Sequence, residues 1–312
     1  MNFKSFLLFI FTALTLNASV KTVCISQVVE HPALNQTKQG IIDTLKNEGF
    51  IEGENLILYT ESAQASPVLA QQIASKFVAR NPDVVVGIGT LSAQSLAKAA
   101  RQGKVFLIFS SVTDPIGAGL VQSLDKPGYA ISGVSNFVAL EPQLAFYKAL
   151  LPNLKRLGVP FNPAEPNSVK IIAQLKILCA QEGVELITQP IMRTADATQS
   201  AMALSKRCDA MFISNDNTCL AALPAIFGVG LKTKTPVLVS DIDTVEQGAL
   251  AAMGPNQYEI GVQTGRMIAR ALRGTAVESM SVEFPSATEG RINESVALTM
   301  GVSIPETLKG KS

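Results

Sequence analysis

The sequence contains no tryptophan and a single histidine, His31, among its 312 residues. One histidine cannot supply a cluster of imidazole ligands, and the spacing of the four cysteines matches no zinc pattern. Lys plus Arg (26) nearly equals Asp plus Glu (25), and no basic block is present that could follow a phosphate backbone. We therefore expect no metal, no cofactor and no nucleic-acid partner.

Catalytic motifs are also scarce. No Gly-x-Ser-x-Gly sequence occurs, and Gly87-Ile88-Gly89 is an incomplete dinucleotide fingerprint because Ser92 stands where the third glycine would be. His31 is the one candidate histidine base, and a Ser–His hydrolase built on it has no further support in the sequence. We therefore expect a protein that is not an enzyme.

The first 18 residues are typical of a secretory signal peptide. Lys4 is the one charge before Lys21, an apolar run covers residues 5–16, and the small residues Ala18 and Ser19 follow. The run is too short to cross a bilayer of about 30 Å as a helix. We expect cleavage near Ser19 and a periplasmic location; an uncleaved anchor is the alternative.

The cysteines lie at separate points of the chain, at Cys24, Cys179, Cys208 and Cys219. Export would permit a disulfide, and Cys208 and Cys219 flank an expected strand. The simpler expectation is four free, mostly buried thiols. The residues before Cys24 lack the small residue that a lipid attachment site needs, so we place Cys24 in the first strand.

Expected strands and helices alternate along the chain, which has the length of about two domains. The strands cover residues 20–29, 55–59, 84–88, 105–109, 156–161, 184–188, 210–214 and 236–239. The helices cover residues 35–48, 68–80, 92–101, 141–150, 168–182, 198–206, 220–227 and 258–273. This alternation predicts an α/β protein with parallel sheets and right-handed crossovers.

Polar residues follow six of the expected strands. They are Glu30-His31, Thr90 to Ser92, Thr113-Asp114, Asn162, Asp216-Asn217 and Asp241. Each alone could be a helix cap or a turn residue. Because parallel sheets bind ligands at the carboxyl ends of their strands, the recurrence predicts a binding site between two lobes.

Several longer motifs resemble one family of bacterial ABC-transporter substrate-binding proteins over essentially the whole chain after the leader. They are Val29-Glu30-His31-Pro32-Ala33-Leu34, Gly49-Phe50-Ile51-Glu52-Gly53, Val112-Thr113-Asp114-Pro115-Ile116-Gly117-Ala118-Gly119-Leu120, Phe161-Asn162-Pro163-Ala164-Glu165-Pro166-Asn167-Ser168, Asn215-Asp216-Asn217, Ser240-Asp241 and Glu246-Gln247-Gly248-Ala249-Leu250-Ala251. Characterised relatives of that family bind aromatic amino acids.

The resemblance implies a two-lobe type I periplasmic-binding-protein fold with a three-segment hinge. The expected N-terminal lobe comprises residues 19–137 and 256–279, and the C-terminal lobe comprises 138–255 and 280–312. It also implies a small amino-acid-like ligand, an ABC permease and ATPase as partners, and a monomer. A ligand-sensing receptor subunit without transport is the alternative.

The sequence departs from the family pattern close to the expected cleft. Pro160 stands in a strand that usually carries a plain apolar residue there, which predicts an edge or irregular strand. Pro166 replaces a small residue, and Pro255-Asn256 replaces an aromatic near the third hinge segment. These changes bear on which ligand is bound.

A free amino acid offers a carboxylate and an ammonium, and the strand ends contain candidates for both. Thr90 to Ala93, including Ser92, open a helix whose N–H groups and dipole suit a carboxylate. Ser168 begins a second such helix, and Thr113 adds a hydroxyl. Asp241 and Asp216 are the candidates for the ammonium, with a turn and a helix cap as their respective alternatives.

The ligand side chain would need an apolar or aromatic pocket. Phe137 lies at the expected hinge and Phe161 lies beside Asn162. Either ring could stack on a ligand, and core packing is the simpler role for both.

Overall fold

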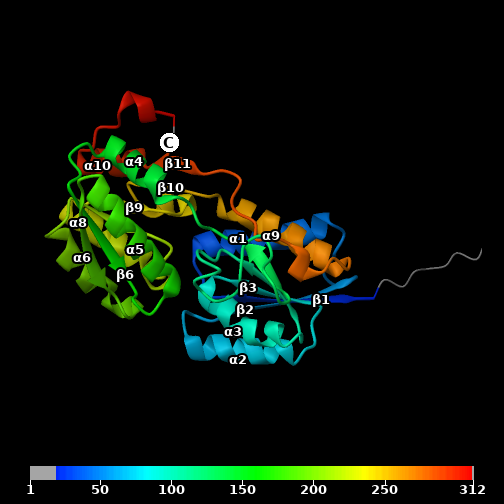
Figure 1. Cartoon of the computed structure of the whole chain (residues 1–312). Helices are drawn as coiled ribbons and strands as arrows, with labels where there is room; N and C mark the ends of the chain where they lie inside the picture. The colour runs from blue at the N-terminus through cyan, green and yellow to red at the C-terminus, as the bar shows by residue number, and fades with distance from the viewer. Residues whose placement is uncertain (1–18, 311–312) are drawn as a thin grey trace, which may run out of the picture.

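The structure, a computed structural model, describes residues 19–310 as two α/β lobes joined side by side (Figure 1). The expected leader, residues 1–18, lies outside the described residues. Among those described, none of the helices is both long and apolar enough to span a membrane. The expected two-lobe α/β fold is confirmed.

The first lobe is built on a five-stranded parallel sheet with the order β2-β1-β3-β4-β5. Its strands are β1 (Lys21–Gln27), β2 (Leu56–Ser62), β3 (Val84–Ile88), β4 (Phe106–Ser110) and β5 (Ile131–Val134). Strand β5 falls in a segment for which the sequence predicts no strand. The order of the strands reverses between β1 and β3, because β2 lies on one side of β1 and the later strands lie on the other. Folds of this kind bind ligands at such a point.

The second lobe has a six-stranded sheet with the order β11-β10-β9-β8-β6-β7. Its strands are β6 (Arg156–Phe161), β7 (Glu185–Pro190), β8 (Ala210–Ile213), β9 (Val237–Val239), β10 (Ala251–Gly254) and β11 (Glu289–Ile292). The expected wholly parallel sheet is wrong at one edge, because β11 pairs antiparallel with β10. Strand β11 reaches that edge only after the chain has returned from the first lobe.

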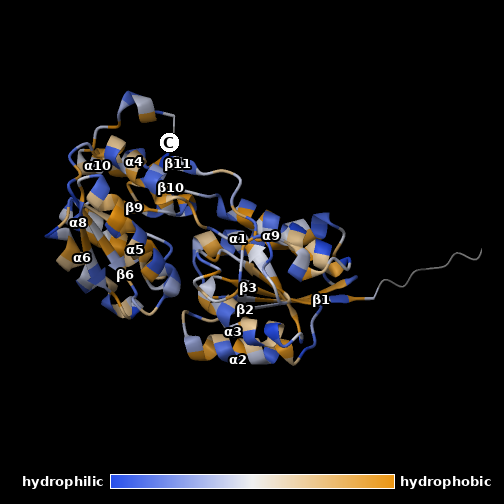
Figure 2. Cartoon of the chain, in the orientation of Figure 1, coloured by the Kyte–Doolittle hydropathy of each residue, from blue (hydrophilic) through white to orange (hydrophobic). Residues whose placement is uncertain are grey.

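Helices cover both faces of each sheet (Figure 1). The helices are α1 (Pro32–Asn47), α2 (Pro67–Val78), α3 (Thr90–Arg101), α4 (Leu140–Leu150), α5 (Pro166–Gln181), α6 (Ala197–Ser205), α7 (Asn217–Leu220), α8 (Leu223–Thr233), α9 (Gln257–Leu272) and α10 (Glu294–Met300). Apolar residues concentrate on the strands and on the inner faces of these helices (Figure 2). This burial is the main force that holds each lobe together.

Three segments of the chain cross between the lobes. The packing of α1 against α9 fixes the second crossing, which leads from β10 into α9. A Cβ added at Gly40 of α1 would collide with the backbone oxygen of Tyr258, and one at Gly261 of α9 would collide with that of Thr37. The two backbones therefore touch along their glycines. Helix α9 follows β10 of the second lobe, so this contact attaches it firmly to the first lobe.

The third crossing comes later than the sequence predicts. The N–H of Glu283 donates to the carbonyl of Gly133, and the N–H of Ser135 donates to the carbonyl of Glu283, both at 2.9 Å. Residues 280–283 therefore run along β5 and belong to the first lobe. The chain returns to the second lobe after Glu283 rather than after residue 279.

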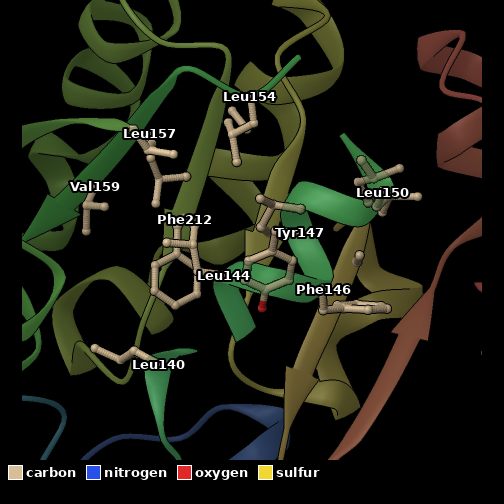
Figure 3. Packing of buried hydrophobic residues seen from close by; sticks show 14 of the residues in the cluster. Leu140, Leu144, Phe146, Tyr147, Leu150, Leu154, Leu157, Val159 and Phe212 are labelled. Carbon is tan, nitrogen blue, oxygen red and sulfur yellow. The ribbon is translucent and has the colours of Figure 1, made fainter. Parts of the chain in front are cut away.

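The core of the second lobe centres on Tyr147 (Figure 3). Its ring packs at a tilt against Phe146 and Phe212, with centroids 5.7 and 5.6 Å away. Its buried hydroxyl donates to the carbonyl of Val239 at 2.7 Å and accepts from the N–H of Met253 at 3.2 Å. Such paired hydrogen bonds remove the cost of burying the phenol.

All four cysteines are free and buried, as the sequence predicts, and Cys24 lies in β1. The alternative disulfide between Cys208 and Cys219 is not formed.

Pro160 does not lie in an edge strand, because β6 lies between β7 and β8. The pairing of β6 with β8 ends at Gly158, so the missing N–H of Pro160 interrupts no bond of that ladder.

Candidate ligand-binding site

Two neighbouring cavities lie between the lobes. The inner one has a volume of about 10 Å³, which is about the space of one water molecule. It is lined by His31, Leu34, Thr90, Ser111, Thr113, Asn136, Asn167, Asn215, Asn217, Leu220, Asp241 and Gln257. Most of these side chains are polar and follow the carboxyl ends of strands in both lobes.

The outer cavity is larger, at about 380 Å³. It is lined by Val28, Gln64, Ala65, Pro67, Leu91 and Gln94 of the first lobe, and by Asn162, Ala164, Glu165, Pro166, Asn167, Met192, Arg193, Thr194, Asn217 and Thr218 of the second. Asn167 and Asn217 line both cavities. The two spaces are therefore neighbours, with these two amides beside both.

An uncapped helix start faces the inner cavity from the first lobe. Helix α3 begins at Thr90 after Gly89, whose φ of +84° favours glycine and whose position provides no capping side chain. Among the described residues, the N–H groups of Thr90 and Leu91 have no backbone acceptor either. These N–H groups and the helix dipole make this point attractive to an anion.

A buried carboxylate faces the same cavity from the second lobe. Asp241 follows β9 and is 2% exposed. Burial and, to a smaller extent, the nearby Asp243 carboxylate raise the pKa of Asp241 to about 7, against a hydrogen bond from Gln257 that lowers it. A cationic group placed beside Asp241 would favour its ionised form.

Two further side chains at the inner cavity have buried atoms without a partner. Both ring nitrogens of His31 and the Oδ1 atom of Asn167 make no hydrogen bond in the structure. Burial lowers the pKa of His31 to about 4, so its ring is neutral at pH 7 and offers one donor and one acceptor. Unpaired buried polar atoms are costly, and a polar ligand would satisfy them.

The carboxylate of Asp216 is already occupied by the protein. It accepts from the N–H of Asn162 at 2.5 Å, the hydroxyl of Ser168 at 2.6 Å and the N–H of Cys219 at 2.8 Å. Asp216 is fully buried and lines neither cavity. Asp216 therefore acts as a helix cap, which is the role that the sequence left open as the alternative to binding a ligand ammonium.

Glu165 holds the loops of the second lobe together at the outer cavity. Its carboxylate accepts from the backbone N–H and side chain of Asn217, from the N–H and hydroxyl of Thr218, and from the amide of Asn167. Burial and the adjacent Asp216 carboxylate raise the pKa of Glu165. Glu165 thereby positions the two asparagines that line both cavities.

The predicted site residues divide into two groups. Those that line a cavity are His31, Thr90, Thr113, Asn162, Asn217 and Asp241. Those that line neither are Glu30, Ser92, Ala93, Asp114, Ser168 and Asp216.

Each member of the second group has another place in the structure. Glu30 pairs with Lys38 on the surface, and Asp114 accepts from the N–H of Gly117. Ser92 and Ala93 are buried on the sheet side of α3, where the Ser92 hydroxyl accepts from Ser26. Helical geometry turns them away from the cavity, because only the first residues of α3 face it.

The sequence analysis missed Gln257, Asn136, Asn167 and Asn215 at the inner cavity. Asn136 follows β5, a strand that was not predicted, and its Oδ1 accepts from the Thr113 hydroxyl at 3.1 Å. Asn167 and Asn215 lie inside the family motifs, but the candidates chosen there were the adjacent Ser168 and Asp216. Gln257 opens α9 after the hinge, so no strand pattern could have revealed it.

Neither phenylalanine considered for stacking lines the inner or the outer cavity. Phe137 and Phe161 pack against the core of the second lobe. Within residues 19–310, His31 provides the one aromatic ring that lines either cavity. In the same residues, no cluster of three His, Cys, Asp or Glu side chains could hold a metal ion.

The family model for "ABC transporter substrate binding protein" matches residues 22–311. A curated relative, the "Tyrosine-binding protein" of Clostridioides difficile (strain R20291), is 33% identical over 88% of this chain and 79% of its own. This family and its characterised members are solute-binding proteins and not enzymes.

Solved structures agree. A conserved domain protein of Vibrio cholerae is 37% identical, with a TM-score of 0.92 over 94% of this chain and 99% of its own. An ABC domain of Streptococcus pneumonia in complex with L-Trp is 30% identical, with a TM-score of 0.90 over the same shares.

A ligand-free, open substrate-binding protein of Clostridium difficile is 33% identical, covers 92% of this chain and 97% of its own, and has a TM-score of 0.70. The present chain therefore superposes better on the L-Trp complex than on the open structure, although the two identities are similar. On the family match and these relatives, the chain belongs to the family of ABC transporter substrate-binding proteins.

Proposed function

We propose that this protein is the periplasmic solute-binding component of an ABC importer and that it binds a free α-amino acid between its lobes. The observation that carries the proposal is the pairing of opposite poles in one cavity. Thr90 lies at an uncapped helix start that suits a carboxylate, and Asp241 is a buried carboxylate that suits an ammonium.

The remaining polar groups fit the same ligand. The neutral ring of His31 and the Oδ1 atom of Asn167 are unpaired at this point. An ammonium has three donors and a carboxylate has several acceptor sites, so a zwitterion could satisfy these atoms together with Asp241 and the N–H groups of α3. Relatives that bind tyrosine and L-Trp support an amino acid as the ligand class.

The inner cavity is too small for both charged groups as it stands. At about 10 Å³ it holds one water, so the ligand must displace the Gln257 side chain from Asp241 or hold the lobes slightly further apart. Binding therefore involves a rearrangement of the Gln257 side chain or of the lobes, after which contacts from both sides hold the ligand.

The proposal is tested by calorimetry on residues 19–312 with L-tyrosine, L-tryptophan and L-phenylalanine. We expect one site per chain. N-acetyl-L-tyrosine lacks the ammonium and L-tyrosinamide lacks the carboxylate, so each should bind at least tenfold more weakly than L-tyrosine, at about 1.4 kcal/mol per decade. Consumption of the ligand, or equal binding of the blocked derivatives, would count against the proposal.

Export to the periplasm is part of the same proposal. It is supported by the pattern of Lys4, the apolar run at residues 5–16 and Ala18. Mass spectrometry of the periplasmic protein should find a new N-terminus near Ser19. The full-length chain in the cytosol would be the contrary result. The permease and ATPase are the partners we expect, with a monomeric binding protein.

A further inference from the structure

We infer that the outer cavity is the subsite for the ligand side chain, and that it selects by size and apolar contact rather than by stacking on an aromatic ring. The inference rests on the proposed amino-acid binding and goes beyond it, because it names the side chains that the site accepts. It also departs from the expectation that Phe137 or Phe161 would stack on a ring.

The position of the outer cavity beside the inner one is the first observation. Asn167 and Asn217 line both spaces, so the outer cavity is the large space next to a zwitterion held in the inner cavity. At about 380 Å³ the outer cavity falls within the range of small-ligand pockets. It has room for side chains from a short aliphatic chain to an indole.

The chemistry of the lining is the second observation. Apolar groups come from both lobes, with Val28 and Leu91 on one side and Pro166 and Met192 on the other. Within the described residues, no Phe, Tyr or Trp side chain lines this cavity. A bound ring would therefore meet aliphatic groups, which attract apolar surface without any preference for a π system.

The polar groups of the lining are the third observation, because most of them already have partners. Arg193 is held by both carboxylate oxygens of Asp196, at 3.2 and 3.0 Å, and the amide of Gln94 donates to the carbonyl of Ala118 at 3.0 Å. Asn162 donates to Thr218 at 2.9 Å, and the Glu165 carboxylate has several donors. These groups make few directional demands on a ligand side chain.

Met192 is the residue best placed to adjust the subsite. It follows β7, is 57% exposed, and carries a flexible thioether that can follow side chains of different shape. A ligand held between the lobes would cover Met192 and Leu91 together. The subsite is therefore complete only when parts of both lobes meet the ligand.

The experiment measures binding of two ligand sets by calorimetry. In the first, L-phenylalanine is compared with L-cyclohexylalanine, which has a similar size and no π system; we expect the two dissociation constants to agree within about threefold. In the second, L-alanine, L-aminobutyrate, L-norvaline and L-norleucine form a series. We expect affinity to rise about fourfold per added methylene, in line with burial of apolar surface.

Two variants locate the effect. Met192→Ala should weaken binding of L-norleucine and L-phenylalanine by about tenfold and leave L-alanine unchanged. Leu298→Ala is the matched control, because Leu298 is 84% exposed on α10 and lines neither cavity. Both changed residues are exposed, so both variants should fold.

The outcomes separate the two proposals. A flat series, a preference above tenfold for L-phenylalanine over L-cyclohexylalanine, or a Met192→Ala effect equal for all ligands would overturn the subsite while amino-acid binding stood. Failure of every amino acid to bind would overturn the proposed function and this inference with it.

Discussion

The amide of Gln257 joins Asp241 of the second lobe to the first lobe. Its Nε2 donates to Asp241 Oδ1 at 2.8 Å, and its Oε1 accepts from the hydroxyls of Thr37 and Ser111, each at 3.1 Å. Gln257 is 1% exposed and opens α9, directly after the second crossing between the lobes. One side chain near the hinge thus uses both ends of its amide to connect the two halves of the site.

The first prediction concerns this bridge. Gln257→Glu places a second carboxylate against the buried Asp241 and removes the one donor that the structure gives it. Since a lost hydrogen bond to a charged group costs about 1.5–3 kcal/mol, we expect thermal unfolding at pH 8 to show a clear loss of stability.

Gln263→Glu is the matched control for that variant. Gln263 lies on the same helix, and its amide donates to the carbonyl of Phe284 at the surface. It makes the same charge change without burial, so the melting temperature should hardly move. Equal melting temperatures for the two variants would contradict a structural role for the bridge.

The second prediction is a pH dependence of binding that originates at Asp241. With its pKa raised to about 7 by burial and by Asp243, the carboxyl is protonated below that pH and must lose its proton to pair with a ligand ammonium. Affinity should therefore fall as the pH is lowered from 8 to 5.5, by at most about tenfold per unit. His31, with a pKa of about 4, stays neutral throughout this range.

Asp241→Asn tests the assignment, because it keeps the size and removes the titrating group. We expect about tenfold or more weaker binding at pH 8 and a nearly flat pH profile. Calorimetry in two buffers of different ionisation enthalpy should detect proton release with the parent protein only. A folded variant that retained both the affinity and the pH profile would refute the pairing.

The third prediction assigns Asp216 to stability. In Asp216→Asn the side chain has one acceptor oxygen for the three groups that donate to Asp216. Its NH₂ group would face an N–H or O–H group instead of accepting from it. We expect chemical denaturation to report a loss of about 2–3 kcal/mol. Glu30→Gln, at an exposed ion pair, should lose little. Comparable losses in both would contradict the assignment.

The alternation of apolar strands and helices was sufficient to predict an α/β protein with mainly parallel sheets, and the family resemblance implied its two-lobe fold. Uniformly buried strands such as β3 are readable because burial on both faces requires a continuous apolar run. The short strands β5, β10 and β11, at or near the sheet edges, were missed. Their sequences are brief, and their pairing depends on segments that are distant in the chain.

The site was predictable only in part. Asp241 and Thr90 were found because they follow strands, and the carboxyl ends of parallel strands meet at one edge. Sequence could not decide between Asp241 and Asp216, because the difference lies in which donors surround each carboxylate. That depends on Ser168 and Asn162, which lie about fifty residues from Asp216 in the chain.

The last prediction is that the ligand closes the lobes. Away from the Gln257 bridge near the hinge, the ion pair that Lys170 and Asp114 make across the cleft is 3.5 Å long and partly exposed, and such pairs contribute about 0–1 kcal/mol. Without ligand, open arrangements should therefore be populated, as thermal energy competes with so small a gain. A ligand that touches Thr90 and Asp241 at once adds contacts that exist only when the lobes meet.

Small-angle scattering should accordingly give a smaller radius of gyration with saturating L-tyrosine than without it. Lys170→Ala should close in the same way, because the ion pair contributes little. Asp241→Asn should need more ligand to reach the same radius, since it loses a contact made only in the closed state. If saturating ligand left the scattering of the parent protein unchanged while calorimetry recorded binding, closure of the lobes would have to be abandoned as the mechanism.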